Sequence, residues 1–345
     1  MTGVPVVAGN VARGQMETSH SGGDALHAAL IAGTAGYLIP LLMTKLKARI
    51  TDSDSWVYRG SWLGAFIMNL ITVSIPGRFD SESTREKRAG TKKAATILEF
   101  SPIFAPAGWA FVIWGVIYFG EMILTAFTVL FGGNSAYSSI LKEATPYWVG
   151  ANAFQSLWCA AFRPKFKKML WLPSICLTMA AFSQLRCLFV VMNNGDVVNS
   201  LVKFFSVSPS ASLTKFAIAF PIALHGGWLC AAALLNFNSF ATESGISMGE
   251  NIALAFLSTY GAALISSYAT AKTLNPLVMW TISWALAAVA YNIKNNKAAQ
   301  AAKLNVDTQQ ALHFTIDSVS KGLLLLSPVM ANISPIRDAV ESAIF

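Results

Sequence analysis

Glu121, Arg186 and His225 are ionisable side chains within long apolar stretches of the sequence. Charged groups are costly inside a bilayer, so those that occur there often serve ion, proton or ligand pathways. Glu121 and Arg186 are therefore candidates for a proton-linked or ligand-linked pair. A structural ion pair is the alternative, as is an arginine whose charged end reaches the lipid headgroups. The sequence leaves both interpretations open.

His225 allows two interpretations as well. Its imidazole could ligate a haem iron or bond a ligand, or it could be a core histidine that faces a backbone carbonyl or Gln155. No second histidine lies three or four residues away, and the HExxH motif is absent. A metal site is therefore not expected.

Aromatic residues form the second chemical signal. Trp109, Phe111, Trp114 and Tyr118 follow one another at intervals of two to four within residues 104–131. Rings beside small residues and side-chain amides could line a pocket for a flat apolar ligand, although plain helix packing explains the pattern equally well. Other tryptophans, such as Trp62, Trp171 and Trp280, fit the aromatic belts at membrane interfaces.

The elements that carry these residues are predicted to be membrane helices. Apolar residues make up 54% of the 345 residues, charged residues only 12%, and mean hydropathy is +0.51. A soluble domain usually carries about 25% charged residues. We therefore expect an all-α, multi-pass membrane bundle with about seven spans. They are predicted at residues 57–75, 104–131, 147–162, 169–192, 213–237, 251–271 and 274–291.

The predicted spans divide the chain into four parts. A polar N-terminus with a membrane-associated helix occupies residues 1–56. A five-helix core follows at 57–240, two additional spans at 241–291, and a tail at 292–345. Residues 308–325 of the tail form an amphipathic stretch, which is expected to lie on the membrane surface.

The net charge of +8 and the four cysteines limit which partners and cofactors are expected. The basic residues cluster beside predicted spans, as expected for contact with anionic lipid, so the bilayer rather than nucleic acid is the expected partner. No cysteine pair has CxxC spacing, so neither a disulfide framework nor a zinc site is indicated.

Three stretches resemble motifs of one known family. Residues 106–118 read PAGWAFVIWGVIY, residues 155–162 read QSLWCAAF, and residues 228–236 read WLCAAALLN. They are similar, in order, to motifs of the TspO/MBR (tryptophan-rich sensory protein) family. The resemblance covers residues 57–240, and the later spans resemble longer members with extra C-terminal helices.

The resemblance implies a five-helix bundle with a pocket near one membrane face, formed partly by the loop after the first helix. Family members bind tetrapyrroles, sterols and other flat lipophiles, and have been linked to transport, stress sensing and porphyrin breakdown. Gln155 departs from the family, which usually has Asn there. The ligand-binding residues implied are Trp109, Phe111, Trp114, Tyr118, Gln155, Trp158, Trp228, Ala232 and Asn236.

Three functions follow as hypotheses. The first is a non-enzymatic receptor, carrier or sensor for a porphyrin, haem or sterol, with no required cofactor. The second is an enzyme that modifies a bound tetrapyrrole, with Glu121 or His225 as acid or base. The third is a structural or assembly subunit, as a homodimer or within a larger complex, in an organellar or other membrane.

Overall fold

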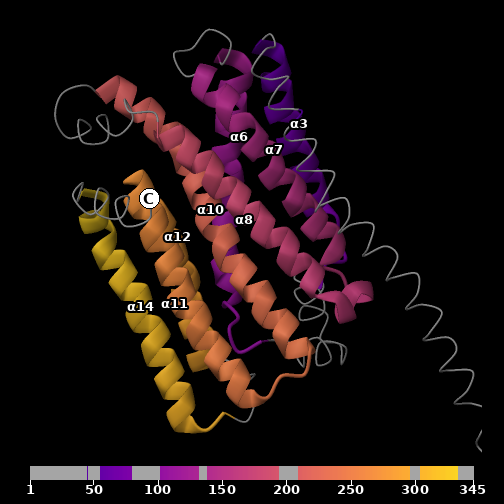
Figure 1. Cartoon of the computed structure of the whole chain (residues 1–345), viewed down its shortest axis with the longest axis vertical. Coiled ribbons are helices and arrows are strands. Elements are labelled where there is room, and N and C mark those ends of the chain that lie inside the picture. The colour runs from indigo at the N-terminus through magenta and orange to yellow at the C-terminus, as the bar shows by residue number, and fades with distance from the viewer. Residues whose placement is uncertain are drawn as a thin grey trace, which may run out of the picture.

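The fold consists of helices packed along a common direction (Figure 1). The structure, a computed structural model, describes Lys45 and residues 55–79, 102–131, 138–193, 209–295 and 304–332. The expected helix at the N-terminus and the last thirteen residues lie outside these ranges. Every regular element in the described part of the chain is helical, which confirms the all-α class. These elements are α3 (Ser55–Ser74), η2 (Gly108–Val112), α6 (Ile113–Phe131), α7 (Ser138–Ala161), η4 (Pro164–Met169), α8 (Trp171–Asn193), α10 (Pro209–Glu243), α11 (Met248–Thr273), α12 (Leu277–Asn295) and α14 (Val306–Asn332).

Five of these helices close a ring. Going around it, α3 packs on α6, α6 on α10, α10 on α8, α8 on α7, and α7 on α3 again. The ring comprises the five helices predicted for the core. Its interior receives side chains from each wall, and most of the candidate site residues lie on three of the helices, α6, α7 and α10.

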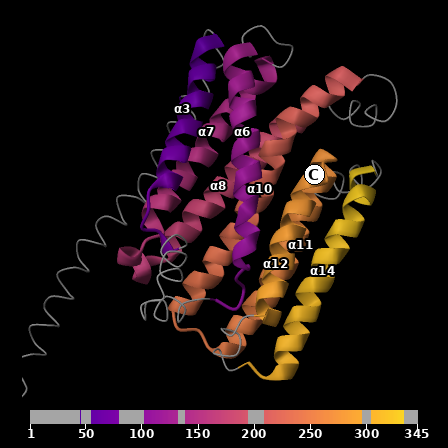
Figure 2. The same cartoon turned by 180° about the vertical axis from the view of Figure 1, so that it is seen from behind.

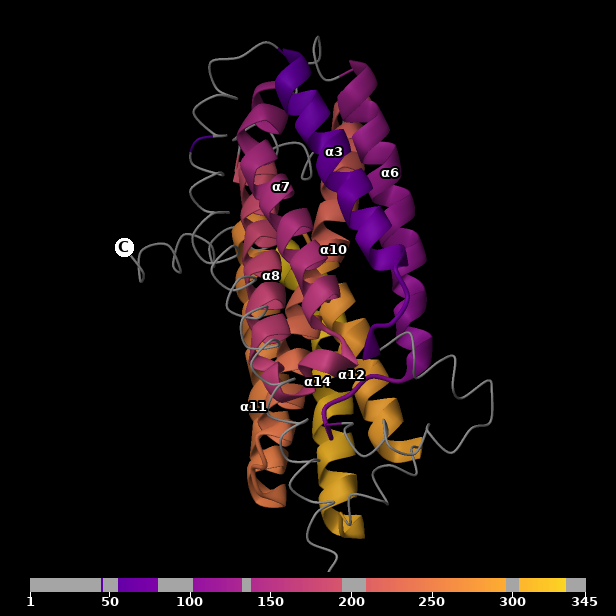
Figure 3. The same cartoon turned by 90° about the vertical axis from the view of Figure 1, so that its right-hand side faces the viewer.

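The remaining helices, α11, α12 and α14, form a C-terminal unit. They pack on one another and meet the ring mainly through α10. In the side view they reach further along the bundle axis than α3 and α6 (Figure 3). As a result, α12 lies beside the end of α6 that carries η2.

Six of the described helices are long and apolar enough to cross a membrane: Gly108–Phe131, Trp171–Met192, Ile218–Glu243, Met248–Thr273, Leu277–Asn295 and Val306–Ala331. This number agrees with a polytopic bundle of about seven spans. The first and third predicted spans correspond to α3 and α7, which are not among the six. They carry the buried amides Asn69, Asn152 and Gln155.

The last helix, α14, differs from the expected surface stretch. It begins at Val306 and runs along α12, where Ser283 and Ser320 exchange hydrogen bonds between side chain and backbone at 2.7 and 2.8 Å. Further along, the Trp280 indole nitrogen donates to the Ser327 hydroxyl at 2.5 Å. Small polar residues commonly join helices in membranes. Here the polar side of the amphipathic pattern includes residues that contact another helix.

Two glycines allow neighbouring helices to approach α10 closely. Gly120 of α6 lies against Pro221 of α10, and Gly227 of α10 lies against Thr281 of α12. A Cβ added at Gly120 would lie 3.0 Å from Cβ of Pro221, and one added at Gly227 would lie 2.7 Å from Cβ of Thr281. The second contact involves atoms next to the backbone, so rotating a side chain cannot relieve it. Gly227 therefore sets the separation of α10 and α12.

We expect Gly227→Ala to destabilise the protein, because the new methyl group forces α12 away from α10. Overpacking of this kind costs about 1–3 kcal/mol. Thermal unfolding in detergent would measure the effect. Gly261→Ala is the matched control, since a Cβ there meets nothing within 4 Å. Equal melting temperatures for the two variants would contradict the close packing.

Candidate functional site

Glu121 and His225 meet in the interior of the ring. Oε1 of Glu121 on α6 lies 2.6 Å from Nδ1 of His225 on α10, and both side chains are fully buried. The close approach of Gly120 to Pro221 brings the two helices together beside this contact. His225 therefore takes a carboxylate as its partner, rather than the backbone carbonyl or Gln155 considered above.

Arg186 does not take part in this pair. Its side chain is exposed on the outside of α8, and its guanidinium lies over the ring of Tyr147, 5.5 Å from the ring centroid. The proposed pairing of Glu121 with Arg186 is therefore wrong. A long side chain can place its charge away from the apolar interior, whereas the shorter histidine at 225 cannot.

Each member of the buried pair keeps a second polar atom without a partner. Oε2 of Glu121 and Nε2 of His225 are buried, and neither finds a hydrogen bond among the described residues. Leaving such an atom unsatisfied costs about 1–3 kcal/mol. Native proteins tolerate few of these atoms, and those that persist often have a chemical role.

An aromatic cluster borders the pair. Trp114 stacks on Tyr118 at a centroid distance of 5.2 Å and meets His225 edge-on at 5.5 Å. Trp114 also lies 6.0 Å from Trp228, which meets Phe111 at 5.5 Å. These four aromatic residues, Phe111, Trp114, Tyr118 and Trp228, are called the aromatic cluster below. They were all predicted site residues, and the structure brings them together.

The cluster extends from the surface of the bundle to its interior. Phe111 is 37% exposed, Trp114 and Tyr118 are half-buried, and Trp228 is only 3% exposed. The ring contacts are therefore continuous from the outside of the bundle to its interior.

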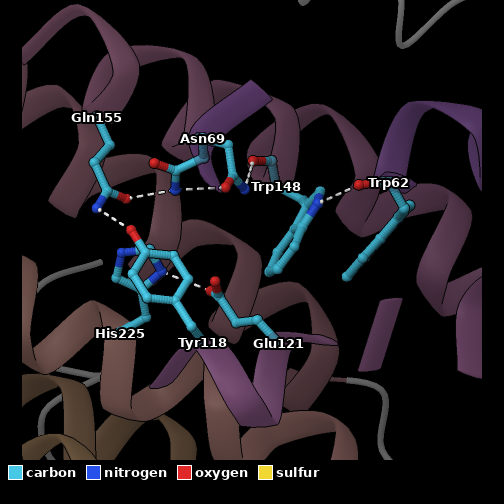
Figure 4. A network of polar contacts seen from close by, with 8 residues as sticks. Trp62, Asn69, Tyr118, Glu121, Trp148, Gln155 and His225 are labelled. Atoms are coloured by element: carbon cyan, nitrogen blue, oxygen red, sulfur yellow. Dashed lines mark hydrogen bonds and ion pairs between the residues drawn. The ribbon is translucent and has the colours of Figure 1, made fainter. Parts of the chain in front are cut away.

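A chain of amides joins the cluster to α3 and α7 (Figure 4). Gln155 donates to the Tyr118 hydroxyl at 3.2 Å and accepts from Asn69 at 2.8 Å. The same Asn69 amide nitrogen donates to Asn152 at 2.8 Å. Sequence reasoning did not single out Asn69, although an amide within an apolar span carries the same signal as Glu121.

Two more predicted residues, Trp158 on α7 and Asn236 on α10, are joined by a hydrogen bond. The Trp158 indole nitrogen donates to Oδ1 of Asn236 at 3.1 Å, and the Arg78 guanidinium lies over the Trp158 ring at 5.5 Å. Asn236 in turn donates to the backbone oxygen of Ala232, one turn earlier on α10. Trp158 and Asn236 form a second buried group, on the same two helices as Gln155 and Trp228, and Arg78 reaches it from the segment after α3.

Trp109 points elsewhere. Its ring meets Trp284 of α12 edge-on at 4.8 Å and Tyr291 at 6.1 Å. Its predicted role in ligand contact stays a prediction. Trp62, assigned above to an interfacial belt, is instead fully buried and stacks on Trp148 at 4.4 Å, so that assignment is wrong.

The arrangement can perform two kinds of chemistry. Aromatic faces and amides can hold and orient a flat molecule, and a carboxylate beside an imidazole can move a proton. No group of three or more His, Cys, Asp or Glu residues that could hold a metal ion occurs in the part of the chain that the structure describes.

Comparison with known proteins gives one match. The sequence profile of a family described as TSPO-like protein matches residues 55–310. This region contains the whole ring and also α11 and α12. No curated protein and no solved structure matches the chain.

The Glu121–His225 contact yields a stability prediction. We expect Glu121→Leu and His225→Leu each to lower the free energy of unfolding by about 3 kcal/mol, because each leaves a buried polar partner alone. The double variant should lose less than the sum of the two, since it leaves no such partner. Detergent-based unfolding would provide all three values.

Lys167→Ala supplies the control, because it removes a partly exposed ion pair with Glu243 at the end of α10 and should change stability little. Strict additivity of the two leucine substitutions would show that the contact contributes nothing.

Proposed function

This chain belongs to the TSPO-like family and is a multi-pass integral membrane protein, and from that premise we propose that it binds a flat lipophilic ligand such as a porphyrin or a sterol. The single observation that carries the proposal is the aromatic cluster. Its rings come from η2, α6 and α10, and they lead from the exposed Phe111 to the buried Trp228.

The physical basis of binding would be stacking combined with a few polar contacts. An aromatic pair contributes about 0.5–1.5 kcal/mol beyond the area that it buries. Three or four rings therefore supply useful affinity for a planar molecule without any ion pair. Gln155 and Tyr118, hydrogen-bonded to each other at the edge of the cluster, would fix the orientation of a polar substituent.

Titration of the detergent-purified protein with protoporphyrin tests this function. We expect saturable quenching of tryptophan fluorescence, and we expect Trp228→Ala to raise the Kd about tenfold because a central buried ring is lost. Trp56→Ala is the matched control, since Trp56 is 69% exposed at the start of α3 and lies outside the cluster. A parallel titration with a sterol, read as competition for the porphyrin, separates the two ligand classes. Linear, non-saturable quenching with both variants unchanged would refute the proposal.

The Glu121–His225 pair favours a second candidate function, an enzyme that isomerises its bound ligand by proton transfer. One member of the pair would take a proton from one ligand atom, and the pair would return it to another. The unpartnered Oε2 and Nε2 atoms are the two positions at which such an exchange would occur.

Incubation with protoporphyrin or a sterol, followed by mass spectrometry and chromatography, distinguishes this enzyme from a simple binding protein. An isomerase yields a product of unchanged mass and altered retention, and Glu121→Gln should slow its formation at least about 100-fold. The ligand Kd should change much less. Recovery of unaltered ligand after prolonged incubation would reject the enzymatic function and leave binding intact.

A further inference from the structure

The segment that leads into α6 is held by α12. Residues 102–107 precede the η2 turn, and Ala107 itself is extended, with φ −65° and ψ 149°. Extended backbone inside a membrane protein needs hydrogen-bond partners beyond its own residues. One helix of the C-terminal unit makes two hydrogen bonds to this segment and a third to η2.

These bonds are evenly spaced on one face of α12. The Trp284 indole nitrogen donates to the backbone oxygen of Ala110 at 3.0 Å. One turn later, the backbone oxygen of Ala288 accepts from the amide of Ala107 at 3.0 Å. After another turn, the Asn292 side chain donates to the backbone oxygen of Ala105 at 2.9 Å. The four-residue interval places all three partners on the same stripe of the helix.

Packing strengthens this attachment. Trp109, within η2, meets Trp284 and Tyr291 edge-on while 40% of it stays exposed. Ala110 is fully buried at the same contact. Seen from behind, the lower end of α6 lies next to α12 (Figure 2).

The same helix also fixes the opposite side of the aromatic cluster. Gly227 of α10 lies so close to Thr281 that not even a methyl group fits between them, and Trp228 is the next residue. Hence α12 contacts both segments that meet in the Phe111–Trp228 pair, η2 on one side and α10 on the other.

We propose that α12 is part of the ligand-binding apparatus, with Trp284 and Asn292 as positioning residues that hold Phe111 against Trp228. Neither side chain has to touch the ligand. They act by fixing the backbone of residues 105–110, and with it the outer ring of the cluster. The expected effect on ligand affinity rests on the proposed binding function, whereas the expected effect on the backbone of residues 105–110 does not.

Trp284→Phe tests the inference with little change in shape. It keeps an aromatic ring against Trp109 but removes the donor to Ala110. Trp280→Phe is a closely matched control, because Trp280 lies one turn away on α12, is similarly exposed, and donates to Ser327 of α14 instead.

Hydrogen–deuterium exchange of the peptide that spans residues 102–112 measures how readily the backbone of this segment opens. We expect exchange to become about fivefold faster in Trp284→Phe, the effect of losing one ordinary hydrogen bond, and to stay at the wild-type rate in Trp280→Phe. Unchanged exchange in Trp284→Phe would overturn the inference whether or not any ligand binds.

Porphyrin affinity, followed through the porphyrin's own absorption band, measures the effect of the substitution on ligand binding. Trp284→Phe should raise the Kd about fivefold, and it should have no further effect once Phe111→Ala has been introduced, because the two substitutions act on one contact. Equal, additive losses in both backgrounds would overturn the positioning role. A wild-type protein that binds no porphyrin would instead refute the proposed function, and the exchange measurement would still decide the role of α12.

Discussion

Polar side chains inside a membrane helix bundle must find their partners within the protein, because hydrocarbon offers none. In this chain the partners lie on different helices. Asn69 of α3 bonds to Asn152 and Gln155 of α7, and Glu121 of α6 bonds to His225 of α10. Apolar packing is non-directional and would allow several rotations of each helix. The polar contacts fix the rotations that place the aromatic rings of α6 and α10 against each other.

Much of this architecture is local information and was therefore predictable. Length and apolarity identify helices without reference to their neighbours, so the spans around α3, α8, α11 and α12 agree with the structure to within four residues. The α-helix α6 begins nine residues later than predicted, after the η2 turn, and α10 extends four residues before and six residues beyond its predicted span. The cost of burying charge likewise marked Glu121 and His225. Their pairing was not predictable, because periodicity states which face a side chain occupies but not which helix lies opposite. By sequence alone Arg186 was an equally good partner for Glu121, yet its side chain extends outwards over Tyr147.

The errors have related causes. Trp62 resembled an interfacial tryptophan by composition, but its burial depends on Trp148, 86 residues away. The pattern of α14 resembled a surface helix because an amphipathic sequence does not state what covers its polar face. Water and lipid headgroups can provide the hydrogen-bond partners of serine side chains, and so can the backbone of another helix. In this fold α12 supplies that backbone, at Ser283.

The η2 turn shows how the ring and the C-terminal unit depend on each other. Trp109 and Phe111 are separated by one residue, and a 3₁₀ turn advances only three residues per revolution, so their side chains leave it in different directions. Trp109 packs against α12, and Phe111 packs against Trp228 of α10. A shift of α12 would therefore move both rings through one short, hydrogen-bonded stretch of backbone. The helices that follow the ring are thus not an independent addition, since one of them holds the segment through which the aromatic cluster reaches the surface of the bundle.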